Sequence, residues 1–400
     1  MSTERIRLLI VDDSAVVRKV VSEGLANDPE IEVVGTATDP YVARDKILQL
    51  NPHVITLDIE MPRMDGLTFL RILMAHRPMP VIIMSSLTQE GSSKAIEALN
   101  AGAVEVLPKP NGSFSTMEDI GRLARAIKAV AGVKLSHRRD SESTKETPVP
   151  ERARTVRPAP APAIRSHAAQ VQPGTTPTDP PETGRKYGAR QIILMGASTG
   201  GTEALKTVLT ALPNNLPGIC IVQHIPAVFS RAFADRLNSL CQLEVREAAQ
   251  GDAVKPGSAL VAPGGYHMVL RWNGACYIVE LNQAPPVHHQ RPAVDVLFES
   301  AVRAGASSHS LAVLMTGMGT DGAAGMLKLR EAKAATIAQN KETCVVFGMP
   351  QEAIRIGAAE RVLPLGQIAG AIRNYASEVC LAPIGNARPA MLTPGPAQLR

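Results

Sequence analysis

The feature that most constrains the fold of this chain is a repeated alternation of short apolar runs with amphipathic ones. In the first 133 residues the apolar runs are 6–11, 31–36, 53–58, 80–85 and 103–107, and helical patterns such as 14–27 and 40–50 lie between them. A continuous apolar run of this length is typical of a strand buried on both faces. Five such strands, each followed by a helix, predict a doubly wound parallel α/β sheet over residues 1–133.

The same alternation returns in the second half of the chain. Apolar runs occupy 191–197, 218–224 and 311–317, and the more polar stretch 243–283 predicts short strands joined by Pro-Gly and Asn-Gly turns. We therefore expect a second doubly wound parallel-sheet α/β domain over residues 191–382.

A proline-rich segment separates the two predicted domains. Residues 134–190 contain nine prolines and few large apolar side chains. Such a segment cannot bury enough surface to offset its ordering entropy, which predicts a disordered, flexible linker. Residues 383–400 are also rich in Pro and Ala, and we expect a disordered tail there.

The net charge of +5 lies in this linker and does not indicate a nucleic-acid surface. Residues 134–190 hold 11 lysines and arginines against 6 acidic residues, so the rest of the chain is balanced, and aromatic residues make up 3% of the sequence. With few aromatic side chains to stack on bases, a neutral body with a basic linker is favoured over a DNA-binding protein, and no nucleic-acid partner is expected.

The cysteines and the hydropathy indicate the compartment. Five scattered cysteines form no CxxC pair, which predicts reduced thiols and no structural zinc. No apolar run approaches the length of a membrane span, and residues 1–25 do not resemble a signal peptide. The sequence therefore predicts a cytoplasmic protein without membrane insertion.

Acidic residues follow two of the predicted strands in the first domain. Asp12 and Asp13 come directly after the first strand, and Asp58 ends the third. The carboxyl ends of parallel strands meet at one edge of the sheet, so these carboxylates are expected to cluster there. Three clustered carboxylates favour a hard divalent cation, and we predict Mg²⁺.

A hydroxyl and an ammonium group are predicted at the same edge. Ser85 ends the fourth strand, and Lys109 follows the fifth. A carboxylate beside a metal and a lysine is equipped to accept a phosphoryl group, because both cations neutralise the transferring oxygens. The alternative, solvated loop acids and a surface lysine, would hold for any one of these residues but explains the set of five poorly.

The segments DDSAVVRK, LDIEMPRMDGL, MSSLT and LPKP, in that order and spacing, resemble a two-component receiver domain over essentially all of residues 1–130. The resemblance implies that Asp58 is the phosphoacceptor and that a histidine kinase is the phosphoryl donor. It also implies that Asp12, Asp13, Asp58 and the Glu60 backbone carbonyl surround Mg²⁺, and that Ser85 and Lys109 contact the phosphate.

A candidate nucleophile lies in the second domain. Ser198, in Gly-Ala-Ser-Thr-Gly-Gly, follows an apolar strand and precedes a helical pattern over 202–212. Flanking glycines permit a tight strand-to-helix turn that exposes the hydroxyl. A glycine-rich turn that binds a phosphate at a helix N-terminus is the alternative, and the motif alone leaves the two nearly equal.

A histidine one crossover later favours the nucleophile. His224 ends the next apolar run, one strand–helix–strand step after Ser198. This spacing places His224 at the same sheet edge as Ser198, where it can act as a general base. The other histidines of this domain (His267, His288, His289 and His309) lie in the polar insertion, in an irregular loop or before a strand.

Asp321 supplies the acid of a predicted Ser–His–Asp set. It follows the strand 311–315 in a glycine-rich stretch, where it can orient the imidazole and stabilise the imidazolium. An Asx turn that caps the next helix is the alternative role, and Asp295 is the rival acid. The chain order Ser–His–Asp differs from that of α/β-hydrolases, chymotrypsin-like and subtilisin-like enzymes, so no fold analogy with them is available.

Six longer stretches carry a second resemblance over roughly residues 191–380: GASTGGTEAL, QHIPAVFSRAFADRLN, APGGYHM, RPAVDVLFESA, MTGMGTDGAAGM and AQNKETCVVFGMPQEAI. They resemble the chemotaxis protein-glutamate methylesterase/glutamine deamidase family, in which a receiver precedes the catalytic domain. The linker here is longer than the short tether associated with that family.

This resemblance implies both an activity and its residues. Ser198 would be the nucleophile, His224 the base and Asp321 its orienting acid, with the backbone N–H groups of Met318 and Thr199 as the oxyanion hole. The implied substrates are γ-methyl glutamyl esters and glutamines on methyl-accepting chemotaxis receptors, and the hydrolysis would need no metal or other cofactor.

Three other functions of the second domain stay open from the sequence. A DNA-binding output would require a helix-turn-helix after the linker, and the strand-rich runs 191–197 and 218–224 argue against it. A hydrolase for a small metabolite would have the same triad, and a silent adaptor would bind receptors without turnover.

Overall fold

The computed structural model describes residues 4–86, 88–109, 117–133 and 187–381. Most of the predicted linker (134–186) and the predicted tail lie outside these residues, so the domain boundaries stay predictions. The two halves of the described chain each contain one parallel sheet with its own helices.

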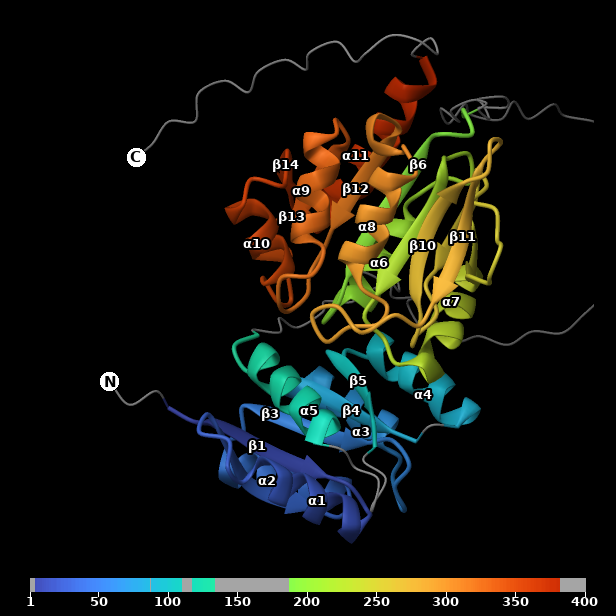
Figure 1. The fold of residues 1–400 in the computed structure, drawn as a ribbon. Coiled ribbons are helices and arrows are strands. Elements are labelled where there is room, and N and C mark those ends of the chain that lie inside the picture. Colours follow the sequence, from blue (N-terminus) through green and yellow to red (C-terminus); the bar gives the residue numbers. More distant parts are fainter. Residues whose placement is uncertain (1–3, 87, 110–116, 134–186, 382–400) are drawn as a thin grey trace, which may run out of the picture. The chain divides into compact units, whose positions relative to one another are not determined.

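The first half is a five-stranded parallel sheet in the order β2-β1-β3-β4-β5 (Figure 1). This order is that of flavodoxin-like folds, in which the chain reverses its winding direction between β1 and β3. Its elements are β1 (Ile6–Val11), α1 (Ala15–Leu25), β2 (Ile31–Ala37), α2 (Pro40–Leu50), β3 (Val54–Asp58), α3 (Gly66–His76), β4 (Val81–Ser85), α4 (Gln89–Asn100), β5 (Glu105–Pro108) and α5 (Met117–Val130).

Alternate residues of β1 supply the two cores of this sheet. Leu8 and Ile10 pack with residues of α1 and α5, whereas Leu9 and Val11 pack with residues of α2 and α3. All four side chains are buried. A strand covered on both faces has to be apolar at every position, which explains the continuous runs in the sequence.

The second half contains a seven-stranded parallel sheet in the order β14-β13-β12-β6-β7-β9-β8. Its elements, with a hairpin of β10 and β11, are β6 (Ile192–Ala197), α6 (Gly201–Thr210), β7 (Gly218–Gln223), α7 (Ala227–Leu240), β8 (Glu244–Glu247), β9 (Ser258–Val261), β10 (His267–Trp272), β11 (Tyr277–Asn282), α8 (Val294–Arg303), β12 (Ser310–Leu314), α9 (Ala323–Glu331), β13 (Ala335–Gln339), α10 (Met349–Arg355), β14 (Arg361–Leu363) and α11 (Leu365–Leu381).

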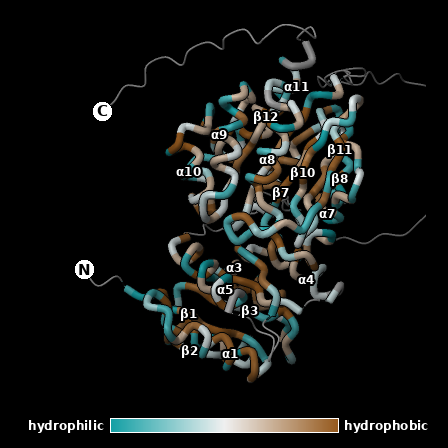
Figure 2. Tube along the Cα trace, viewed as in Figure 1, coloured by the Kyte–Doolittle hydropathy of each residue, from teal (hydrophilic) through white to brown (hydrophobic). Residues whose placement is uncertain are grey.

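The central strand β6 is likewise buried on both faces. Ile193 and Met195 face a core with α6, α7 and α11, and Ile192 and Leu194 face a core with α8, α9 and the β10–β11 hairpin. Hydrophobic residues accordingly concentrate on the strands in Figure 2.

The expectation of two parallel-sheet α/β domains is confirmed, and the expected strands lie within a few residues of the observed ones. The polar stretch 243–283 holds more than the short strands and turns we expected. β8 and β9 extend the main parallel sheet, and only β10 and β11 form a separate antiparallel pair.

Candidate active site and phosphoacceptor pocket

The strand register brings the candidate catalytic residues to one edge of the seven-stranded sheet. Ala197 at the end of β6 pairs with Gln223 at the end of β7, so Ser198 and His224 follow directly paired residues. On the other side of β6, Gly196 pairs with Leu314 of β12, from which the chain continues to Asp321. The winding direction changes between β6 and β12, and open α/β sheets bind ligands at such a reversal.

Glycines shape the turn that carries Ser198. Gly200 has a φ of +76°, which disfavours other residues, and the Gly201 N–H donates to the Ser198 carbonyl at 2.7 Å. A side chain at Gly317 would lie 2.7 Å from the Ser198 Cβ. The backbone of the loop after β12 therefore approaches Ser198 closely, and the Ser198 N–H donates to the Thr316 carbonyl at 2.9 Å.

His224 and Asp321 form a buried pair. The distance between His224 Nε2 and Asp321 Oδ2 is 2.7 Å, and the exposed fractions of the two side chains are 3% and 2%. A nitrogen that faces a carboxylate carries the proton, so Nδ1 keeps its lone pair. Among the described residues Nδ1 has no hydrogen-bond partner, and the structure shows no hydrogen bond between the ring and the Ser198 hydroxyl.

Asp321 is stabilised as a carboxylate. Its Oδ2 also accepts a hydrogen bond from the Val294 N–H at 2.7 Å, and its Oδ1 accepts one from the Asp295 N–H at 3.0 Å. Burial opposes ionisation, but the contact with His224 and the two backbone donors outweigh it and lower the pKa of Asp321. Asp295, the rival acid, does not contact His224 in this structure and instead pairs with His288.

Sequence reasoning missed Gln223, whose side chain links the backbones of Ser198 and His224. Its Nε2 donates to the Ser198 carbonyl at 2.8 Å and to the His224 carbonyl at 3.2 Å. The side chain is buried at 3% exposure. A polar residue that ends a wholly apolar strand was the available signal, because a buried amide needs specific partners.

The segments that carry the predicted oxyanion donors are tied to each other. The Thr316 hydroxyl donates to the Thr199 carbonyl at 2.9 Å, and the Gly317 carbonyl accepts hydrogen bonds from Gly348 and Met349. Met318 follows Gly317 in this loop, and Thr199 follows Ser198. Both backbone N–H groups thus belong to segments that flank Ser198, the candidate nucleophile.

The predicted phosphoacceptor pocket lies at the β1–β3 reversal of the first sheet. Ligand atoms of Asp12, Asp13 and Asp58 lie within 4.8 Å of one another. Lys109 Nζ is 2.6 Å from Asp58 Oδ2 and 3.6 Å from Asp12 Oδ2, and the Asp58 Oδ1 accepts a hydrogen bond from the Glu60 N–H at 3.0 Å.

These residues fit a hard divalent cation. The Asp12 Oδ2 is buried and accepts no hydrogen bond from the described residues. Burial, the main cause, and the neighbouring Asp12 raise the pKa of Asp58 to about 6, although Lys109 opposes this shift. Carboxylate oxygens with spare acceptor capacity are the ligands Mg²⁺ prefers.

Ser85 lies at the end of β4 as predicted, but its hydroxyl donates to the Gly91 carbonyl at 3.1 Å. A contact between Ser85 and a phosphate on Asp58 therefore requires that this hydrogen bond break.

The two halves thus define a class of protein, a receiver joined to a candidate serine hydrolase. Family models agree with this division: residues 8–120 match the response regulator receiver domain, and residues 193–372 match the CheB methylesterase. The described residues contain no helix with the length and hydropathy of a membrane span.

Two curated relatives match nearly the whole chain. The chain is 50% identical over 368 residues to protein-glutamate methylesterase/protein-glutamine glutaminase 2 of Syntrophus aciditrophicus, covering 92% of this chain and 98% of the relative. It is also 50% identical to the corresponding enzyme of the group 3 operon of Rhodopseudomonas palustris, covering 92% and 95%. The crystal structure of the Thermotoga maritima CheB methylesterase catalytic domain is 39% identical, with a TM-score of 0.45, and covers 46% of this chain and 97% of that one.

The chain belongs to the family of CheB-type protein-glutamate methylesterases/protein-glutamine glutaminases, whose activity is regulated by a receiver domain.

Proposed function

We propose that Ser198, His224 and Asp321 hydrolyse the substrate through an acyl-enzyme. The Ser198 Oγ attacks the carbonyl carbon of a glutamyl γ-methyl ester while His224 Nδ1 takes the hydroxyl proton. The imidazolium then returns this proton to the departing methoxide, which leaves as methanol. Water hydrolyses the acyl-enzyme by the same route, which yields a glutamate carboxylate and regenerates Ser198. With a glutamine substrate, ammonia leaves in place of methanol.

The observation that supports this mechanism best is the buried 2.7 Å contact between His224 and Asp321 beside the Ser198 turn. It holds the proton on Nε2 and leaves Nδ1, the nitrogen without a partner among the described residues, as the base. The backbone N–H groups of Met318 and Thr199 are the proposed donors to the developing oxyanion, since both segments flank the nucleophile.

The proposed substrates are methylated glutamates and glutamines on methyl-accepting chemotaxis receptors. The names of the relatives specify protein glutamate and glutamine as their substrates. The test compares methanol and ammonia release from methylated receptor membranes with methanol release from small methyl esters. Much faster turnover of the receptor supports the proposal. Preference for the small ester would identify a metabolite hydrolase instead, and binding without methanol release would identify an adaptor.

The proposed regulator is phosphorylation of Asp58 by a histidine kinase. When Mg²⁺ is bound by Asp12, Asp13, Asp58 and the Glu60 carbonyl, it supplies positive charge that offsets the charge of the incoming phosphoryl group. Lys109 supplies a second positive charge, 2.6 Å from the acceptor oxygen. We place the protein in the cytoplasm, where such a kinase has its phosphoryl donor.

Phosphorylation is proposed to shift the receiver toward a state that permits access to Ser198. The test is methanol release with and without a small-molecule phosphoryl donor, in wild type and in Asp58→Ala. Activation in wild type alone supports the proposal, and equal rates in all four samples would contradict it.

A further inference from the structure

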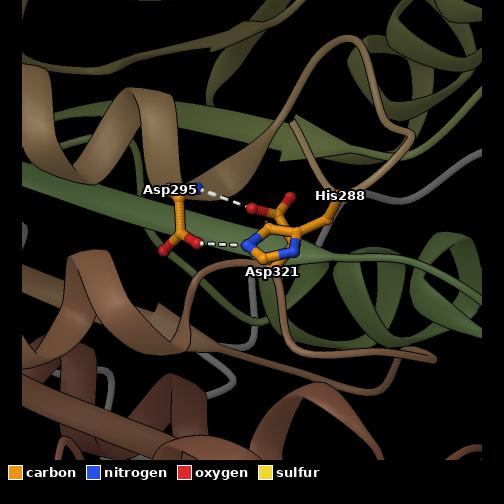
Figure 3. A group of neighbouring side chains, drawn as sticks. All are labelled: His288, Asp295 and Asp321. Atoms are coloured by element: carbon orange, nitrogen blue, oxygen red, sulfur yellow. Dashed lines mark hydrogen bonds and ion pairs between the residues drawn. The ribbon is translucent and has the colours of Figure 1, made fainter. Parts of the chain in front are cut away.

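The triad acid lies in a second hydrogen-bonded cluster that the mechanism does not use. Figure 3 shows Asp321 beside Asp295 and His288, with the Asp295 N–H directed at Asp321 and the Asp295 carboxylate directed at the His288 ring. Asp295 is 5% exposed and Asp321 1% exposed, whereas the His288 side chain is 46% exposed.

The two acids cap each other's helices. Asp321 directly precedes α9's capping residue Gly322, yet its carboxylate accepts from Val294 and Asp295 in the first turn of α8. Asp295 belongs to that first turn, and its Oδ1 accepts a hydrogen bond from Gly325 in the first turn of α9 at 2.7 Å. Each carboxylate thus satisfies backbone donors that the other helix leaves without partners.

The local sequence makes this exchange possible. A side chain at position 325 would place its Cβ 3.0 Å from the Asp295 Oδ1, so a glycine there allows the close approach. The second oxygen of Asp295 accepts from His288 Nε2 at 3.2 Å. His288 lies in a loop, and its own φ of +51° is a backbone conformation that few L-residues adopt.

These contacts favour a positioning role over a metal site. The ligand atoms of His288, Asp295 and Asp321 are close enough together to bind an ion. However, each of the four carboxylate oxygens already accepts at least one hydrogen bond, from Gly325, His288, Asp295, or both Val294 and His224. To bind an ion, His288 Nε2 would have to give up its hydrogen bond to Asp295, and the Asp321 Oδ2, which already accepts two hydrogen bonds, would have to release Val294 or His224.

We propose that Asp295, supported by His288, is a positioning residue that holds Asp321 in hydrogen-bonding reach of His224. This inference rests on the proposed role of Asp321. If the Asp295 carboxylate is lost, the Gly325 N–H has no acceptor and the two helix ends are joined only through Asp321. Asp321 then shifts relative to His224, and a displacement of about 1 Å near a reacting group costs about 100-fold in rate.

The test measures kcat and KM for methanol release from methylated receptor with the full-length phosphorylated chain. Asp295→Leu should lower kcat about 100-fold with little change in KM. Asp295→Asn keeps an oxygen that can accept from the Gly325 N–H, and its kcat should be close to that of wild type. His288→Ala should give a smaller decrease. Glu299→Gln, on the same helix and paired with Lys328 on the surface, is the matched control and should equal wild type.

A double-mutant cycle with Asp321→Ala separates positioning from a general structural effect. If Asp295 acts through Asp321, Asp295→Leu should cause no further loss of kcat in the Asp321→Ala background. Equal losses in both backgrounds, or a wild-type kcat for Asp295→Leu, would overturn the inference. If Asp295→Leu fails to unfold cooperatively, the same cycle is run with His288→Ala and judged by the same criterion. Wild-type activity of Asp321→Ala alone would instead overturn the proposed function.

Discussion

At the scale of single residues, the direction of the His224 ring determines which of its two nitrogens is free to accept a proton. Because Nε2 faces Asp321, Nδ1 is the nitrogen that we propose as the base, and the proton on Nε2 would stay in a buried hydrogen bond during the reaction. Asp321 can stay ionised in this buried place because two backbone N–H groups also donate to it.

The ionisation of Asp321 predicts a pH-dependent stability. Its pKa is lower in the folded chain than the value of about 3.9 for an unfolded aspartate. Its contribution is therefore complete above the unfolded pKa and is lost as the pH falls through the folded pKa. Asp321→Asn should be less stable than wild type at pH 7, and the difference should shrink below about pH 4. The measurement is urea unfolding followed by the fluorescence of Trp272, the single tryptophan. A difference that stayed constant down to pH 3 would contradict this account.

Gln223 provides a second prediction at this scale. Gln223→Leu removes the side-chain donor that the Ser198 and His224 carbonyls share. The Ser198 carbonyl keeps the Gly201 N–H, but a buried acceptor that is left unsatisfied costs about 1–3 kcal/mol. We expect lower thermal stability and a decrease in kcat of at least about tenfold, because the backbones of Ser198 and His224 lose a common hydrogen-bond donor. Gln250→Leu, at an exposed glutamine of the same half, is the control. A wild-type kcat in Gln223→Leu would show that the other contacts of Ser198 and His224 are enough to hold their backbones in place.

At the scale of elements, the sequence predicted which residues share a sheet edge. Continuous apolar runs identify buried strands, and the parallel arrangement places Ser198, His224 and Asp58 at strand ends without further information. The choice between Asp295 and Asp321 depends on loop paths and on caps between α8 and α9. These contacts are long-range, and no local pattern of residues encodes them. For the same reason, the place of β8 and β9 in the main sheet was not foreseen.

The α9 cap supplies a prediction for this scale. Gly322 has a φ of +87°, and a side chain there would lie 2.7 Å from Leu314 and from Val294. Gly322→Ala should therefore destabilise the chain by about 1–3 kcal/mol and lower kcat, since Val294 donates to Asp321. Gly319→Ala is the matched control, because Gly319 has a φ of +88° but no atom within 4 Å of the added methyl. Equal effects of the two substitutions would mean that backbone strain alone is responsible.

At the scale of the whole molecule, two candidate sites with different chemistry each lie where the winding of a parallel sheet reverses. The acidic pocket lies at the β1–β3 reversal, and Ser198 lies at the β6–β12 reversal. One sheet edge carries clustered carboxylates suited to a cation, and the other carries a hydroxyl, an imidazole and backbone donors. Phosphoryl transfer and ester hydrolysis are therefore expected to have separate requirements.

This separation can be tested by metal removal. Chelation of divalent cations should abolish phosphoryl incorporation at Asp58, because the clustered carboxylates then lack their counter-charge. It should leave the basal methanol release of the unphosphorylated enzyme unchanged. Asp58→Asn should show the same pattern without chelator. Loss of basal hydrolysis on chelation would indicate that a metal takes part in the second site as well.

The central claim is that the Ser198 hydroxyl forms the acyl-enzyme, and the most direct measurement is methanol release by Ser198→Ala under phosphorylating conditions. We expect the rate to fall by at least about 1,000-fold, with thermal unfolding and phosphorylation of Asp58 unchanged. Methanol release within about tenfold of wild type by a folded, phosphorylated Ser198→Ala protein would contradict the account.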